Sequence, residues 1–258
     1  MKVAVLGAGP SGMMAAHAVS QCGYYVDIFD KDPSSSRRNS GVYFLHADCD
    51  LMLDPVLIKQ SVIGHHGKKI DEISKLYGLK VYGKEISKPS IVSVISKSTM
   101  TGFNSEHAIT RLWDFYGKQV KEGEISNLGQ VKGLFDTYDK IISTIPAWVL
   151  YPDQKFESVE TWIKVGKAPE NEAFMFYNIN PYCDWYRCSA MFGVFTQEYG
   201  YGKHFEKKEG YEYKKVIKVI GDGITSEIKD LFLVGRYGAW NKKTLTHDVY
   251  YRTLEWLQ

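Results

Sequence analysis

The chain has 258 residues, of which 44% are hydrophobic and 24% are charged, as is usual for a globular protein with a real core. Its formal net charge of +2 excludes a strong electrostatic footprint for nucleic acid or a membrane surface. No apolar run approaches the roughly 18 residues that span a bilayer, and the N-terminus begins directly with an apolar strand. We therefore expect a cytoplasmic protein without a signal peptide.

The cysteine and histidine patterns exclude two further classes of site. The chain contains four cysteines: Cys22, Cys49, Cys183 and Cys188. None of them forms a CxxC motif, so we expect reduced thiols and no redox-active disulfide. His65 and His66 are adjacent, so they point in different directions, and no ligand cluster accompanies them. We therefore expect no metal site.

The first thirty residues carry the strongest functional signal. Residues 2–6 (KVAVL) are typical of a buried strand, and the glycine turn 7–12 (GAGPSG) follows them. A predicted helix at 13–21 and a second strand at 25–29 then end on Asp30. A GxGxxG motif alone is a weak signal, but this order of elements is typical of a dinucleotide-binding βαβ unit. The alternative, a glycine turn in an α/β core with a solvent-exposed acid, leaves the glycine spacing unexplained.

Each position of the turn has a physical role in that interpretation. Gly7 permits the tight turn, Gly9 lets the backbone approach a pyrophosphate, and Gly12 lets the helix pack closely on the strands. Pro10 is tolerated in the first helical turn, whose N–H groups and dipole favour an anion. The carboxylate of Asp30 would accept hydrogen bonds from ribose hydroxyls.

Hydrophobic periodicity places the remaining elements. Further helices are predicted at residues 68–77, 106–116 and 246–257. Further strands are predicted at residues 41–46, 79–82, 91–95, 140–145, 173–179, 185–196, 213–220 and 231–234. The segments 173–179 and 185–196 predict an antiparallel pair joined by a turn at Asn180-Pro181. The two ends of the chain thus form one nucleotide-binding unit with an antiparallel sheet inserted.

Three further segments resemble flavoproteins of the glutathione-reductase-like FAD class. They are residues 40–46 (SGVYFLH), 138–146 (YDKIISTIP) and 231–240 (LFLVGRYGAW). In that class the first passes the isoalloxazine, the second lies near the adenine-side core, and the third contacts the ribityl chain and pyrophosphate. The branch resembled most holds the UDP-galactopyranose mutases and FAD-dependent amine oxidases, here in a short, phage-like form.

The resemblance has limits. Members of that branch are usually much longer, and residues 51–125 and 151–220 do not align with either kind of enzyme. Arg236 stands where an acid is often found, as it does in mutase-like members.

The resemblance implies a fold and a cofactor. The fold class is α/β, a doubly wound, Rossmann-like FAD-binding domain with an inserted antiparallel β-sheet substrate domain. We assign residues 1–50, 105–150 and 225–258 to the FAD-binding domain, and 51–104 and 151–224 to the substrate domain. FAD is favoured over NAD because the chain returns at its end to a buried strand with a GRYG turn. A single glycine fingerprint also argues against a second NAD(P)H domain.

The predicted site combines these motifs. Cofactor contacts are assigned to Gly7, Gly9, Pro10, Ser11, Gly12, Asp30, Lys31, Gly41, Val42, Phe44, Val131, Thr144, Pro146, Gly235, Arg236, Tyr237 and Trp240. Catalytic roles are assigned to His46, Tyr177 and Arg187. His46 either stands beside the flavin, where it donates to a ring carbonyl or shuttles a proton, or ends a strand at the surface. Tyr177 is either a pocket residue or a core aromatic, and Arg236 either neutralises phosphate or reduced flavin or forms a surface ion pair.

Three functions remain open on this evidence. The first is an FAD-dependent, amine-oxidase-like oxidoreductase acting on a small or nucleotide-linked polar substrate. The second is a mutase-like enzyme that uses reduced flavin without net redox change. The third is a flavin-binding module without turnover. The sequence does not decide the substrate, the electron acceptor or the oligomeric state.

Overall fold

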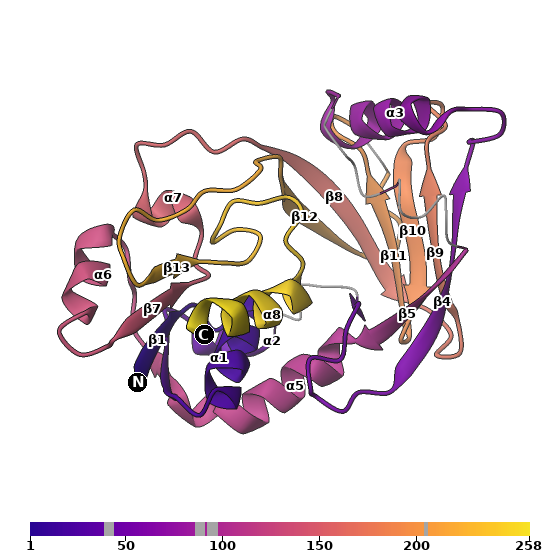
Figure 1. Ribbon diagram of the computed structural model, residues 1–258. Helices are drawn as coiled ribbons and strands as arrows, with labels where there is room; N and C mark the ends of the chain where they lie inside the picture. Colours follow the sequence, from indigo (N-terminus) through magenta and orange to yellow (C-terminus); the bar gives the residue numbers. More distant parts are fainter. Residues whose placement is uncertain (39–43, 86–90, 92–97, 204–205) are drawn as a thin grey trace. The chain divides into compact units, whose positions relative to one another are not determined.

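The computed structural model describes residues 1–38, 44–85, 91, 98–203 and 206–258, which form a mixed α/β protein of two compact units (Figure 1). Unit 1 consists of Met1–Asp54, Phe103–Glu157 and Gly221–Gln258. Unit 2 consists of Pro55–Gly102 and Ser158–Ile220.

Unit 1 is built on a five-stranded sheet of order β13-β7-β1-β2-β6. Its strands are β1 (Lys2–Leu6), β2 (Tyr25–Asp30), β6 (Val120–Glu122), β7 (Lys140–Ser143) and β13 (Leu231–Leu233). Every neighbouring pair is parallel, so the carboxyl ends of all five strands lie on one edge. In open parallel sheets, ligands bind at that edge, where the strand order reverses direction.

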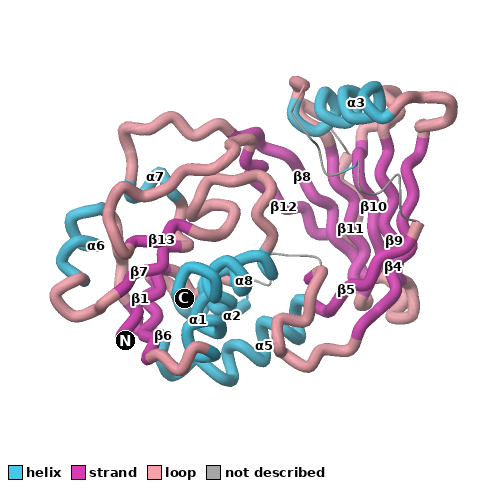
Figure 2. The backbone as a smooth tube through the Cα atoms, viewed as in Figure 1, coloured by secondary structure: helices cyan, strands magenta, loops and turns pink. Residues whose placement is uncertain are grey.

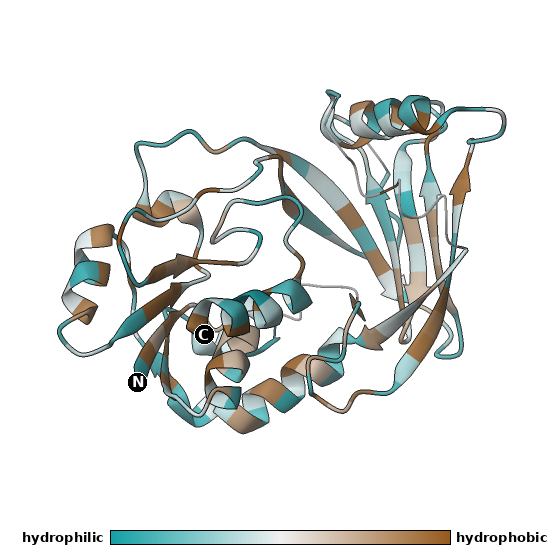
Figure 3. Ribbon diagram, in the orientation of Figure 1, coloured by the Kyte–Doolittle hydropathy of each residue, from teal (hydrophilic) through white to brown (hydrophobic). Residues whose placement is uncertain are grey.

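Helices cover both faces of this sheet. They are α1 (Pro10–Gln21), α2 (Pro33–Arg38), α5 (Ser105–Tyr116), α6 (Leu128–Leu134), α7 (Ala147–Leu150) and α8 (Thr246–Leu257). Because side chains alternate along a strand, Val3 and Val5 of β1 pack with α1, α5 and α8. Ala4 and Leu6 pack on the opposite face with α6 and α7. Because helices cover both faces of the sheet, its strands are apolar on both sides, as Figure 3 shows for β1 and β13.

The second sheet has eight strands, in the order β12-β8-β11-β10-β9-β4-β5-β3 (Figure 2). They are β3 (Phe44–Leu45), β4 (Pro55–Ile63), β5 (Thr99–Asn104), β8 (Ser158–Lys167), β9 (Ala173–Asn178), β10 (Trp185–Met191), β11 (Val194–Tyr199) and β12 (Glu212–Val219). Within unit 2, β8 to β12 pair antiparallel, whereas β4 and β9 pair parallel. Within unit 1, the last two residues of β5 pair with β3.

Helix α3 (Ile70–Tyr82) packs on the unit 2 sheet. The ring of Tyr77 lies 6.0 Å from that of Tyr177 and 5.9 Å from that of Tyr186. The helix ends at Gly83, whose φ of +70° is readily adopted by glycine.

Several predicted elements are confirmed, and others are wrong. Helices α5 and α8 match the predicted segments 106–116 and 246–257 closely. The strand predicted at 79–82 is wrong, because α3 continues to Tyr82 with Ile73, Tyr77 and Val81 buried on one face.

The segment 185–196, predicted as one strand, is a hairpin. Phe192 and Gly193 have φ of +53° and +74°, and they form the turn between β10 and β11. The predicted pairing of residues 173–179 with this segment is confirmed by the antiparallel β9–β10 register. Residues 41–43 and 92–95 of two predicted strands lie outside the described residues. Within the described part of the chain, no helix combines the length and apolar character needed to cross a membrane.

Candidate functional site

The turn after β1 requires glycine at two positions. Gly7 has a φ of +94°, and a Cβ there would stand 2.8 Å from Thr144 Oγ1. Its N–H donates to the carbonyl of Phe29 at 2.7 Å, which closes the turn against β2. A Cβ on Gly12 would stand 1.7 Å from the Gly7 carbonyl oxygen, so helix α1 packs directly on the turn. Side chains at these two positions are excluded by the protein itself.

Gly9 lies in open space instead. Apart from its chain neighbours, no atom of the described residues lies within 4 Å of the Cβ that a side chain would place at Gly9. Gly9 is also the N-cap of α1, and no side chain caps this end of the helix. Helix N-termini carry backbone N–H groups without intrahelical partners and the positive end of the helix dipole. The residues present therefore fit an anionic group that lies against the backbone of Gly9.

Asp30 connects the turn to the end of β2. The residue is 8% exposed, and its Oδ2 accepts hydrogen bonds from the Ala8 N–H at 2.6 Å and the Ser36 hydroxyl at 3.0 Å. Its Oδ1 accepts from the Asp32 N–H at 2.8 Å. An ionised carboxylate offers about four acceptor positions, so Asp30 retains capacity for one further donor.

The C-terminal turn meets the glycine turn. Gly235 has a φ of +85°, and a Cβ there would stand 3.0 Å from Ser11 Oγ. A Cβ on Gly238 would stand 2.7 Å from the carbonyl oxygen of Ser143, at the end of β7. The hydroxyl of Thr144 donates to the Leu6 carbonyl at 2.8 Å, which links β7 to β1. The structure thus brings four predicted segments together at the carboxyl edge of the sheet.

Arg236 and Tyr237 are the exposed residues of the C-terminal turn. Within the described part of the chain Arg236 makes no ion pair, and both roles predicted for it stay predictions. Tyr237 is 37% exposed, and partial burial raises the pKa of its hydroxyl, an effect that the charge of Arg236 opposes.

The remaining residues predicted to contact a cofactor occupy varied environments. Trp240 is 4% exposed, its ring packs against Trp148 and Phe156, and its Nε1 donates to the Glu157 carbonyl at 3.1 Å. Val131 of α6 is fully buried in the core beneath β7 and β13. Both are core side chains in this structure.

Pro10 is the first residue of α1, Pro146 immediately precedes α7, and Lys31 is exposed beside Asp30. Gly41 and Val42 lie outside the described residues.

His46 lies between two other rings of unit 1. Its ring centroid is 4.7 Å from that of Phe44 and 5.1 Å from that of His247. Although part of His46 is exposed, desolvation and the neighbouring His247 lower its pKa to about 4, against a smaller opposing effect of Asp248. The imidazole is therefore neutral at pH 7 and can donate or accept a hydrogen bond without carrying charge.

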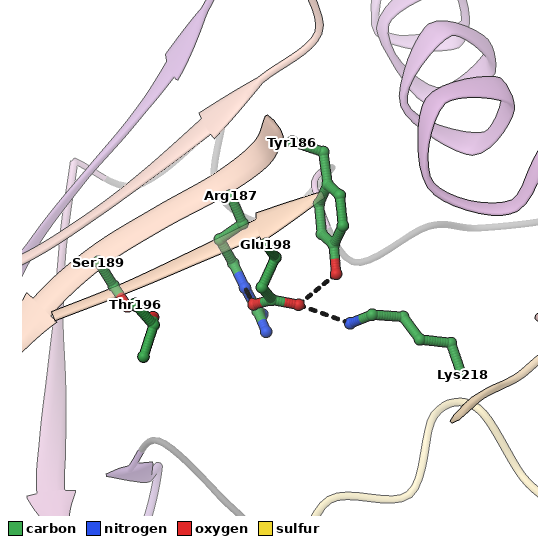
Figure 4. Close-up of polar contacts among 6 residues, drawn as sticks. All are labelled: Tyr186, Arg187, Ser189, Thr196, Glu198 and Lys218. Atoms are coloured by element: carbon green, nitrogen blue, oxygen red, sulfur yellow. Dashed lines mark hydrogen bonds and ion pairs between the residues drawn. The ribbon is translucent and has the colours of Figure 1, made fainter. Parts of the chain in front are cut away.

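Tyr177 and Arg187 belong to unit 2. Figure 4 shows Arg187 in a polar cluster with Tyr186, Glu198 and Lys218. The carboxylate of Glu198 accepts hydrogen bonds from Arg187 Nε, from the Tyr186 hydroxyl and, at 2.8 Å, from Lys218 Nζ. Arg187 also hydrogen-bonds to Tyr177. Burial alone would raise the pKa of Glu198, but Arg187, Lys218 and Tyr186 hold it at about 2, so the group is ionised.

Sequence reasoning missed several residues of these two sites. Glu198 and Lys218 were not identified, although an acid at an inward position of an apolar strand is a usable signal. Ser36 was not identified either, because its bond to Asp30 depends on a tertiary fold that no local pattern specifies.

Among comparisons with known proteins, only solved structures match, and they share the fold of this chain. No protein-family model and no curated protein sequence matches the chain. A reduced UDP-galactopyranose mutase superposes with a TM-score of 0.62 at 12% identity, over 98% of this chain and 94% of that one. The PF1083 protein from Pyrococcus furiosus gives a TM-score of 0.58 at 11% identity, over 99% and 98% of the two chains.

A third solved structure is an oxygenase. The tetrameric form of 2-methyl-3-hydroxypyridine-5-carboxylic acid oxygenase gives a TM-score of 0.52 at 12% identity, over 98% of this chain and 85% of that one. At these identities the similarity establishes a shared fold along nearly the whole chain.

Proposed function

We propose that this protein is an FAD-dependent flavoenzyme that holds the cofactor's pyrophosphate at the glycine turn of unit 1. The observation that carries the proposal is the open space at Gly9, between two glycines whose side-chain positions the protein fills. The backbone at Gly9 is thus left accessible at the N-terminus of α1, where an anion is stabilised. Superposition on a UDP-galactopyranose mutase along nearly the whole chain supports the same assignment.

The residues around the turn have distinct roles in this proposal. The remaining acceptor position on Asp30 receives a ribose hydroxyl, while its existing bonds to Ala8 and Ser36 keep the carboxylate in place. Gly235 and Ser11 bring the C-terminal turn against the cofactor's pyrophosphate end. Arg236, exposed beside Gly235, supplies a positive charge to the phosphate or to the reduced ring.

Bound FAD would supply the redox or nucleophilic chemistry, and the chain supplies binding and orientation. His46 is neutral at pH 7, so it contributes a hydrogen bond or a proton relay rather than a fixed charge. Tyr177 and Arg187 of unit 2 are proposed to contact the substrate.

We propose the reaction to be that of an oxidoreductase resembling the amine oxidases, acting on a small or nucleotide-linked polar substrate. A second candidate is mutase-type chemistry, in which reduced flavin acts without net redox change. The TM-score of 0.62 with a UDP-galactopyranose mutase favours this candidate.

A single experiment separates the candidates. The purified protein is loaded with FAD, its visible spectrum is recorded, and it is reduced anaerobically and then exposed to candidate substrates. Reoxidation by air with peroxide release, after reduction by an amine, supports the oxidase. Turnover that requires reduced flavin and consumes no electrons supports the mutase. Bound flavin that no substrate reduces, with no turnover in either state, supports the non-catalytic module.

A further inference from the structure

Unit 2 contains a cluster of charged side chains contributed by strands β10, β11 and β12. Arg187 of β10 and Glu198 of β11 face each other in the strand register. Lys218 reaches the same carboxylate from β12, two strands further along the sheet order. Figure 4 shows the Glu198 carboxylate between Arg187 on one side and Lys218 and Tyr186 on the other. We call Arg187, Glu198 and Lys218 the charged cluster.

The charged cluster has an excess of positive charge. Two cations pair with one carboxylate, so the three side chains carry a net charge of +1. The neighbouring Tyr77 and Tyr177 add no negative charge, because burial raises the pKa of both hydroxyls. An anionic ligand at the cluster would give both cations a further charge-assisted partner.

Exposure within the cluster differs between the acid and the cations. The Glu198 side chain is 0% exposed, whereas the side chains of Arg187 and Lys218 are each 18% exposed. A group arriving from solvent therefore meets the cations, with the carboxylate buried behind them. The carboxylate fixes the two cations, because its two oxygens accept from Arg187, Lys218 and Tyr186 together.

A buried hydroxyl on the same face of the sheet adds a second observation. Thr161 of β8 is 1% exposed, and its Oγ1 has no hydrogen-bond partner among the described residues. Ile163 lies opposite Glu198, and Thr161 is two residues along the same strand, so Thr161 and Glu198 share a face. Strand β8 also lies between β11 and β12, which carry Glu198 and Lys218. A polar ligand at the cluster would satisfy a group that is otherwise buried without a partner.

We propose that the charged cluster is an anion-recognition site, which takes a phosphate or carboxylate group through Arg187 and Lys218. Arginine binds either group through a planar fork of N–H donors, and lysine adds a point charge. Glu198 acts as a positioning residue that holds both cations in place. We assign the anionic group to the substrate of the proposed flavoenzyme. This assignment rests on the proposed function.

The test is a calorimetric titration of the FAD-loaded protein with inorganic phosphate at constant ionic strength, repeated with malonate as a carboxylate probe. Arg187→Gln and Lys218→Gln are each expected to weaken binding of the better probe by about tenfold. Arg187→Lys, which keeps the charge but loses the planar fork of donors, is expected to retain only part of the affinity.

Lys215→Gln is the matched control, because Lys215 lies on the opposite face of β12 and pairs with Glu160. This variant is expected to bind as the wild type does. The preference between phosphate and malonate identifies the kind of anion. Lys218→Gln leaves the Arg187–Glu198 pair intact, so it carries the test if Arg187→Gln does not fold.

Titration of the wild-type apoprotein and of the Gly9→Val protein separates this site from the glycine turn, which is open to phosphate when no FAD is bound. Binding that persists in Gly9→Val and is lost in Lys218→Gln supports the charged cluster. Binding of neither anion, or equal binding by the wild type and Lys218→Gln, overturns the proposal. Absence of flavin from the wild type instead contradicts the proposed function and leaves the titration interpretable.

Discussion

Gly235 lies directly against Ser11, so the turn after the last strand touches the glycine turn after the first. A Cβ on Gly235 would stand 3.0 Å from both Cβ and Oγ of Ser11, although the two residues belong to opposite ends of the chain. Strands β13 and β1 flank β7 in the parallel sheet, and this arrangement places both turns at one edge. The turn after β13 therefore forms part of the candidate site of unit 1, and the site is complete only when this turn has folded against the glycine turn.

The open space at Gly9 makes a specific prediction. Gly9→Val is expected to abolish FAD binding while the protein keeps its fold, because a Cβ at this position meets no described atom beyond its chain neighbours and the side chain occupies the space proposed for the pyrophosphate. Flavin absorbance after loading and the circular dichroism spectrum measure the two effects. Native FAD affinity in a folded Gly9→Val protein would show that the pyrophosphate lies elsewhere.

Gly12→Val serves as the contrasting variant. Its Cβ would stand 1.7 Å from the Gly7 carbonyl oxygen, so helix α1 would have to move away from β1. We expect a loss of at least about 3 kcal/mol in the free energy of unfolding, measured by denaturant titration. Stability equal to the wild type would contradict the close packing of helix and turn.

Arg236 is expected to act on the cofactor through charge. Arg236→Ala is predicted to weaken FAD binding by about tenfold to hundredfold, because a charge-assisted hydrogen bond contributes roughly 1.5–3 kcal/mol. Lys229→Ala, which removes an exposed cation shortly before β13, is the control and is expected to bind FAD normally. Equal affinity of Arg236→Ala and the control, measured by fluorescence titration of the apoprotein, would remove Arg236 from the site.

The charged cluster predicts a pH dependence of stability. The folded pKa of Glu198 is about 2, below its ordinary value of 4.5, so the unfolded chain binds more protons between these pH values. The stabilisation from Glu198 is therefore fully present above about pH 5 and is lost as pH falls through about 2.

Glu198→Gln removes this ionisation. Its free energy of unfolding, measured by denaturant titration between pH 5 and pH 2 (the approximate limits set by the folded and unfolded pKa), should fall less steeply than that of the wild type. Parallel curves for the two proteins would show that Glu198 does not contribute in this way.

Local patterns predicted the elements with strong periodicity and missed those set by tertiary pairing. Helix α8 has a one-sided apolar face and begins at the predicted residue. Strand β4 (PVLIKQSVI) alternates buried and exposed positions but was overlooked, because its parallel pairing with β9 joins segments far apart in the chain. The hairpin turn at Phe192-Gly193 was missed because a non-glycine residue occupies one of its left-handed positions.

The candidate site residues also fall into those that a local motif predicts and those that only the folded structure brings together. The glycine turn is a contiguous motif, so its geometry follows from the sequence. Trp240 belongs to a motif that resembles a flavin contact, yet its indole is committed to Trp148, Phe156 and the Glu157 carbonyl. The partners of Glu198 come from two strands, β10 and β12, and only the register of the folded sheet brings them together.

The most direct test of the account is the affinity of the purified protein for FAD, measured from the visible spectrum and by titration of the apoprotein, with NAD as the competing ligand. The account predicts that the protein purifies with flavin or binds one FAD per chain on addition, and that Gly9→Val loses this binding. A protein that binds NAD and shows neither flavin absorbance nor affinity for FAD would contradict it.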